Sequence, residues 1–143
     1  MKIWFRKRSP TTHALRVRRA DGSEEARELD TRSFLRHDLV HLAVELEVPY
    51  HAGYWGSVAA GGSLSGGAFS GELAEAERLV GPLQTLAREG APVARYAAVL
   101  ARVLGERGTP ELAARIHARL RSLLGHWRGT LCGEAMQVEW ACL

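Results

Sequence analysis

Both ends of the chain carry the two-residue periodicity of β-strands, which constrains the fold more than any other feature of the sequence. Near the C-terminus, residues 135–142 alternate between an apolar and a polar face. The apolar face consists of Met136, Val138, Trp140 and Cys142. A single strand with so apolar a face is not stable alone and needs a sheet to join.

The N-terminal region supplies that sheet. Three short segments, 2–8, 13–20 and 24–29, have strand-like patterns, and Asp21-Gly22 lies between the last two. Asp-Gly is a favoured hairpin turn because glycine tolerates a positive φ. The sequence therefore predicts an N-terminal antiparallel β-meander that is joined by the C-terminal strand.

Four segments with helical spacing of apolar residues lie between these ends: 33–47, 72–89, 93–105 and a helix that begins at Thr109-Pro110-Glu111. We expect Gly81-Pro82 to kink or split the second one, because proline lacks the amide proton that an α-helix uses. A length of 143 residues suits one domain, 1–143. The predicted fold class is α+β, with three or four antiparallel strands packed against about four helices.

Residues 52–71 contain seven glycines but no lysine and no phosphate-binding motif. We interpret the segment as a connection in which residues 53–61 form a short packed helix. Its Gly/Ser-rich part, 62–71, is predicted to be a flexible loop.

The helix at 33–47 carries the most informative pattern. At about 100° per residue, His37, His41, Glu45 and Asp38 fall within one narrow stripe, while apolar residues occupy the remaining arc. A helix that is apolar around most of its circumference is expected to be buried. The stripe then lies against protein or lines a cleft.

Buried imidazoles and carboxylates are costly unless they are paired or bind a metal. Histidines at i and i+4 have the spacing of helical zinc ligands. The predicted ligands of a divalent metal, zinc or similar, are His37, His41 and Glu45, and the predicted catalytic residues are Asp38 and Glu45. Asp38 can act as a fourth ligand, orient an imidazole or serve as base for a bound water. His51 is the nearest further donor.

Residues 35–45 and 53–61 resemble a family of small bacterial proteins that share an HDLxHxxVE helix followed by GxWGxxAxG. No activity is established for that family, so the resemblance implies no reaction. His37, Asp38 and His41 also resemble the metal-binding HDxxH element of ubiquinone-biosynthesis proteins. In that family a glutamate follows after eleven further residues, at the position that Gly53 occupies here.

The charge balance does not favour nucleic-acid binding. The net charge is +3, and the excess lies in residues 1–36, with 10 Lys/Arg against 5 Asp/Glu. Glu24, Glu25 and Glu28 can neutralise arginines across the predicted sheet. Two cysteines do not make a disulfide framework, and no signal peptide or membrane span is recognisable. We therefore expect a cytoplasmic protein with no membrane association.

Two functions are compatible with the polar stripe. In the first, a His/Asp/Glu pocket on the helix at 33–47 binds a divalent metal for hydrolytic or lyase-type chemistry. In the second, the chain is a non-catalytic protein-interaction or homo-oligomeric module, such as a homodimer, in which the stripe is a structural hydrogen-bond network. The sequence specifies neither the substrate nor the partner.

Overall fold

The computed structural model describes residues 1–67 and 70–141, and the predicted place of Cys142 on the apolar face of the last strand therefore lies outside the described residues. The elements are β1 (Lys2–Lys7), β2 (Thr12–Arg18), β3 (Glu24–Asp30), α1 (Thr31–Glu47), α2 (Tyr54–Ala59), α3 (Gly71–Glu89), α4 (Val93–Leu104), the short 3-10 helix η1 (Gly105–Arg107), α5 (Pro110–Gly129) and β4 (Ala135–Glu139).

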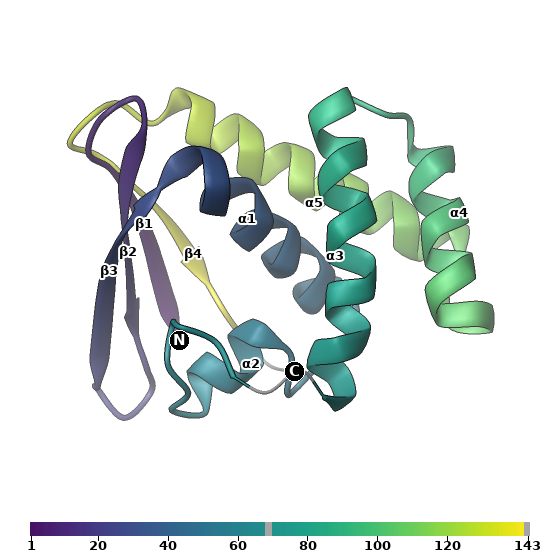
Figure 1. The fold of residues 1–143 in the computed structure, drawn as a ribbon, viewed down its shortest axis with the longest axis horizontal. Helices are drawn as coiled ribbons and strands as arrows, with labels where there is room; N and C mark the ends of the chain where they lie inside the picture. Colours follow the sequence, from purple (N-terminus) through teal and green to yellow (C-terminus); the bar gives the residue numbers. More distant parts are fainter. Residues whose placement is uncertain (68–69, 142–143) are drawn as a thin grey trace.

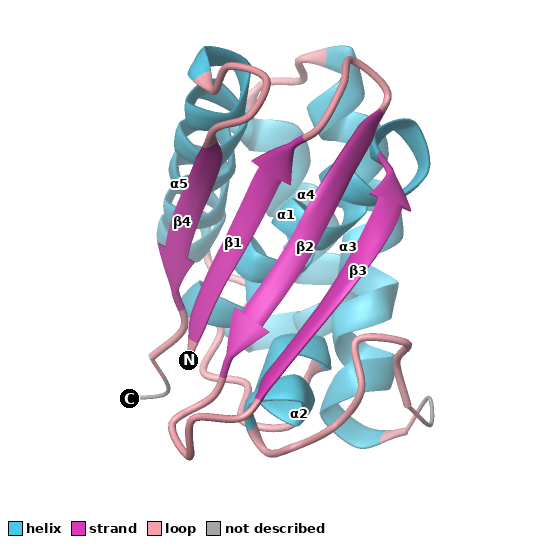
Figure 2. Ribbon diagram, turned by 90° about the vertical axis from the view of Figure 1, so that its left-hand side faces the viewer, coloured by secondary structure: helices cyan, strands magenta, loops and turns pink. Residues whose placement is uncertain are grey.

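The four strands form one antiparallel sheet in the order β3-β2-β1-β4, as Figure 2 shows. β1 pairs with β2 so that Lys2 lies opposite Arg18, and with β4 so that Lys2 lies opposite Glu139. The predicted meander and its C-terminal partner strand are thus confirmed, as is the α+β fold class. The two ends of the chain meet in neighbouring strands because neither β1 nor β4 can bury its apolar face alone.

α1 is the central helix of the fold. It lies between the sheet and helices α3 and α5 (Figure 1), and nine of its residues are buried. The inner face of the sheet contributes side chains with no more than 1% exposure, namely Ile3, Phe5, Leu15, Val17 and Met136. Each such side chain contributes about 1.5–3 kcal/mol by leaving water. The predicted burial of the helix at 33–47 is confirmed.

Side-chain caps mark where α1 and α5 begin. Asp30 caps α1 by accepting a hydrogen bond from the Ser33 amide at 2.9 Å, and Thr109 caps α5 in the same way. Of the two effects expected of Gly81-Pro82, the split is wrong, since α3 continues through Pro82, and the kink stays a prediction. Apolar side chains on both sides of Pro82 are buried against the rest of the core, and this packing holds the two halves in one helix.

The connection between α1 and α3 contacts the β2–β3 turn and the start of β3. Arg19 of the β2–β3 turn donates to the carbonyl oxygens of Val58 and Gly62, at 2.6 and 2.7 Å, and Glu25 accepts from the Leu64 amide at 3.0 Å. The flexibility expected of residues 62–71 stays a prediction. No helix in the described part of the chain is both long and apolar enough to cross a membrane.

Candidate metal centre

His41 is the buried centre of the polar stripe. Its side chain has no exposed area, and each ring nitrogen faces a carboxylate. Nδ1 lies 3.0 Å from Oε1 of Glu45, one turn further along α1, and Nε2 lies 2.9 Å from Oε1 of Glu77 on α3. The ring is therefore fixed in both position and rotation.

His37 repeats this arrangement one turn earlier. Its ring centre is 4.7 Å from that of His41. Its Nδ1 is 3.4 Å from Oδ1 of Asp38, and its Nε2 is 3.6 Å from Oε2 of Glu77. One carboxylate on α3 thus faces the Nε2 atoms of two histidines on α1. A ligand atom from each of the three side chains lies within 4.8 Å of the other two.

Glu77 is the residue that the sequence analysis missed. It comes from a helix 36 positions further along the chain than His41. In the sequence, Glu77 could be recognised only as a carboxylate at the edge of an apolar stripe. It lies one turn after Leu73 and three residues before Val80, both of which are buried. Such a position favours an acidic residue only if a buried polar partner lies opposite it.

Glu45 lies on the Nδ1 side of His41 and binds the start of α2. Its carboxylate accepts, besides His41, three backbone N–H groups that begin this helix, at 2.8, 3.0 and 3.4 Å: those of Tyr54, Trp55 and Gly56. The first amides of a helix have no partner within the helix and carry a partial positive charge, so a carboxylate there is stabilising. Glu45 therefore joins α1, α2 and the imidazole of His41.

A pocket of about 200 Å³ opens beside the three side chains. Asp38, His37 and Glu77 line it, together with Tyr54, whose hydroxyl donates to the carbonyl oxygen of Leu64 at 2.9 Å. The side chain of Asp38 is only 7% exposed, and within the described part of the chain its one hydrogen bond is the long one to His37. The remaining walls are mostly apolar and include Leu29, Phe34, Leu64 and Leu73, with Arg27 among the lining residues.

The carboxylates determine the charge of His41. Burial alone lowers the pKa of this imidazole, but hydrogen bonds to Glu45 and Glu77, with the charges of both, outweigh burial and raise it to about 9. In return, the hydrogen bond from His41 lowers the pKa of Glu77. In the metal-free protein at neutral pH, His41 is therefore an imidazolium that donates to a carboxylate on each side.

This charge predicts how the metal-free protein responds to alkaline pH. The pKa of His41 is about 9 in the folded protein, against 6.5 for an ordinary histidine. The protonated ring therefore stabilises the fold fully below pH 6.5, and this stabilisation is lost as the pH rises through 9. The difference corresponds to about 3 kcal/mol. Urea unfolding in the presence of a chelator, at pH 6.5 and at about pH 10, measures it. The variant His41→Gln should lack this component, and an equal alkaline loss in that variant would contradict the assignment.

Gly53 is required by the close approach of Glu45 to the start of α2. A Cβ atom at Gly53 would overlap the Glu45 carboxylate. We expect Gly53→Ala to lower the free energy of unfolding by about 1–3 kcal/mol, as for other overpacked buried sites. Gly129→Ala is the control, since no atom lies within 4 Å of a Cβ there. Equal melting temperatures for the two variants would show that the contact is unimportant.

The structure brings together some of the residues predicted from the sequence. His37 and His41 face one point, and Asp38 lies beside them at the pocket. Glu45 faces the opposite nitrogen of His41, so the structure offers Glu77 at the place where a third ligand was expected. His51 is not among the three grouped side chains; it is exposed, and its backbone amide donates to Glu72 at 2.7 Å.

Comparison of the chain with protein-family models, with curated proteins and with solved structures found no match.

Proposed function

We propose that the chain binds a divalent metal ion and uses it for hydrolytic or lyase-type chemistry in the pocket beside α1. The proposed ligands are Nε2 of His37, Nε2 of His41 and a carboxylate oxygen of Glu77. The observation that carries the proposal is that both Nε2 atoms face the same carboxylate, that of Glu77, which lines a pocket together with His37. Membership of the small bacterial family stays a prediction, and the proposal does not depend on it.

The donor set has the chemistry of a catalytic site. Two histidines and one glutamate leave a fourth position open, as in zinc sites that activate water. Tetrahedral bonds of about 2.0–2.1 Å need ligand atoms roughly 3.4 Å apart. The present spread of up to 4.8 Å can close through side-chain rotation, because His37 and Glu77 are both partly exposed. His41 is already fixed.

We assign Glu45 a positioning role in place of the ligand and catalytic roles predicted from the sequence. Metal-bound histidines usually donate their second ring nitrogen to a carboxylate, which fixes the tautomer and increases the basicity of the ligand. Glu45 does this for His41 at 3.0 Å. Metal binding at Nε2 would displace a proton from the His41 imidazolium and leave the Nδ1 hydrogen bond in place.

Asp38 is the proposed general base. It directly follows the first histidine of the pair, as does the glutamate base in the His-Glu-x-x-His helix of metallopeptidases. Its carboxylate is buried, lines the pocket and makes one long hydrogen bond to a described residue, His37. A carboxylate with unused acceptor capacity can take a proton from a metal-bound water. The pocket of about 200 Å³ limits the substrate to a small molecule or to a small group of a larger one.

One observation favours the second function, a structural network. The imidazolium of His41 already has a carboxylate on each nitrogen, so this group is satisfied without a metal. In that case the chain is a non-catalytic module, and the homodimer expected from the sequence becomes the more relevant assembly. This second function does not explain the pocket or the buried Asp38 carboxylate that lines it.

Metal analysis of protein purified without an affinity tag separates the two functions. We expect about one equivalent of zinc, iron, manganese or nickel, or uptake of one equivalent of Co²⁺ with the visible absorption of a tetrahedral N/O site. His41→Ala should lose the metal, and its metal-free form should be less stable than the unchanged chain because buried Glu45 loses its partner. The variant His126→Ala removes an exposed histidine of α5 and serves as the control. The absence of both bound metal and a Co²⁺ spectrum would establish the network instead; a loss of stability in metal-free His41→Ala is expected in either case, because the variant removes one partner of a buried ion pair.

A further inference from the structure

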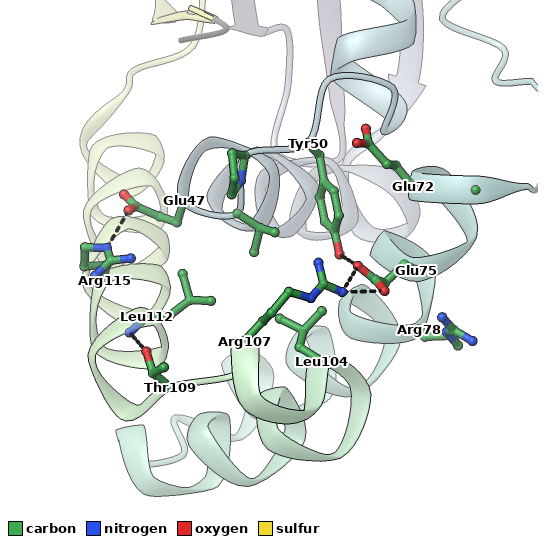
Figure 3. A pocket seen from close by; sticks show the side chains of 13 residues that line it. Glu47, Tyr50, Glu72, Glu75, Arg78, Leu104, Arg107, Thr109, Leu112 and Arg115 are labelled. Atoms are coloured by element: carbon green, nitrogen blue, oxygen red, sulfur yellow. Dashed lines mark hydrogen bonds and ion pairs between the residues drawn. The ribbon is translucent and has the colours of Figure 1, made fainter.

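Figure 3 shows a second cavity, which has a volume of about 590 Å³. It shares no lining residue with the pocket beside His37. Its walls come from the C-terminal end of α1, the start of α3, η1 and the start of α5. The volume falls in the range of about 300–1,000 Å³ that is usual for small-molecule sites, which often form between helices.

The floor of this cavity is apolar. Val48, Tyr50, Leu104 and Leu112 line it, and each is less than 10% exposed. Tyr50 turns its hydroxyl toward Glu75 and donates to it at 2.6 Å, so its ring remains as an apolar surface. A ligand in the cavity would therefore place hydrocarbon against these side chains.

At one end of the cavity, arginine side chains have N–H groups that make no hydrogen bond to the described residues. Nη2 of Arg107 donates to both oxygens of Glu75 at 2.7 Å. Nε and Nη1 of Arg107 have no partner among the described residues. Arg78, which is exposed, makes no hydrogen bond to any side chain in this part of the chain, but its charge helps to lower the pKa of Glu75. The Glu75 carboxylate thus contacts the guanidinium of Arg107, while that of Arg78 lines the same cavity without a direct contact to it.

At the other end of the cavity, two arginine side chains donate to one carboxylate, that of Glu47. Glu47 accepts from Nε of Arg115 at 3.1 Å and from Nε of Arg119 at 2.6 Å. Elsewhere in the lining, Glu72 accepts two backbone N–H groups, those of His51 and Ala52. Each carboxylate of the cavity already has at least two donors, while several guanidinium N–H groups, such as Nε and Nη1 of Arg107, have no acceptor among residues 1–67 and 70–141. Guanidinium groups with free N–H groups favour an oxyanion, which they can bind with two parallel hydrogen bonds.

We propose that this cavity binds a small amphipathic anion. Its carboxylate or phosphate accepts hydrogen bonds from Arg107 and Arg78, and its hydrocarbon part lies on Leu104 and Leu112. The site is independent of the metal centre.

The test uses the full chain, labelled with ¹⁵N and held metal-free with a chelator. Octyl phosphate and octanoate are the probes, and octylamine and inorganic phosphate are the controls for charge and for the hydrocarbon part. We expect saturable shifts of the amides of Tyr50, Leu104 and Leu112 with one or both octyl anions. The relative affinity of the two anions identifies the preferred head group. Octylamine and inorganic phosphate should bind far more weakly.

Two variants locate the contact. Arg107→Gln and Arg78→Gln should each weaken binding by about tenfold, the loss expected for a hydrogen bond to a charged group. Arg78 is exposed, so its replacement leaves the fold intact even if Arg107→Gln disturbs the contact with Glu75. Arg88→Gln, at an exposed position of the same helix, should bind normally. Equal binding of octylamine, shifts centred on Tyr54 and Leu64, or unchanged affinity in both variants would each overturn the proposal.

Discussion

Replacement of Glu45 by alanine lowers the free energy of unfolding by about 3–5 kcal/mol on this account, the usual cost of removing one partner of a buried ion pair. The side chains of Glu45 and His41 have no exposed area. The variant would leave Nδ1 of His41 and the first amides of α2 without their acceptor. Urea unfolding of the metal-free protein measures the loss.

A surface glutamate provides the control for this variant. Glu106 in η1 is exposed, and Glu106→Ala should change the free energy of unfolding by less than about 0.5 kcal/mol. The loss of unfolding free energy in Glu45→Gln should lie between those of the two alanine variants. The amide keeps one oxygen that can accept, but its NH₂ group faces backbone N–H groups, which are also donors. A loss below about 1 kcal/mol in Glu45→Ala would mean that the carboxylate does not hold α1 and α2 together.

Replacement of Glu77 by alanine is the second large expected effect, and it acts on metal affinity. Loss of a direct ligand should weaken binding by more than about a hundredfold, whereas loss of a residue that orients a ligand costs about 10–100-fold. Glu45→Gln belongs to the second group because Glu45 contacts His41 only at Nδ1. Titration with Zn²⁺ in competition with a chromophoric chelator measures both affinities.

The order of these affinities separates the proposed ligands from the predicted ones. Asp38→Asn should bind the metal nearly as well as the unchanged chain and should lose whatever hydrolytic or lyase-type turnover the protein has. Glu89→Ala, at the exposed C-terminal end of α3, is the control for Glu77→Ala. If Glu45→Gln lost more affinity than Glu77→Ala, the ligand set predicted from the sequence would be the correct one.

The fold could be predicted because its signals are local. Alternation near residues 2–30 and 135–140 predicted the strands, and the apolar surface of the helix at 33–47 predicted its burial. The continuity of α3 through Pro82 could not be predicted, because local rules treat proline as a break. Burial of Leu79 and Leu83 against other elements outweighs that local preference, and these contacts depend on the assembled core.

The candidate site was predictable only as far as α1. His37, His41 and Asp38 share one stripe, and their spacing follows from helix geometry. Glu77 approaches from another helix, and no periodicity along the chain links it to His41. The positioning role of Glu45 could not be predicted for a related reason. The backbone N–H groups that it binds come together only when residues 54–59 form α2, directly after Gly53.

Anomalous diffraction from crystals of the zinc-loaded chain, collected at the zinc absorption edge, tests the central claim most directly. The account predicts one strong peak within about 2.0–2.2 Å of Nε2 of His37, Nε2 of His41 and a carboxylate oxygen of Glu77. Glu45 should remain on Nδ1 of His41 without touching the metal. A peak bonded to Glu45, or zinc bound only elsewhere with the contact between His41 and Glu77 unchanged, would contradict it.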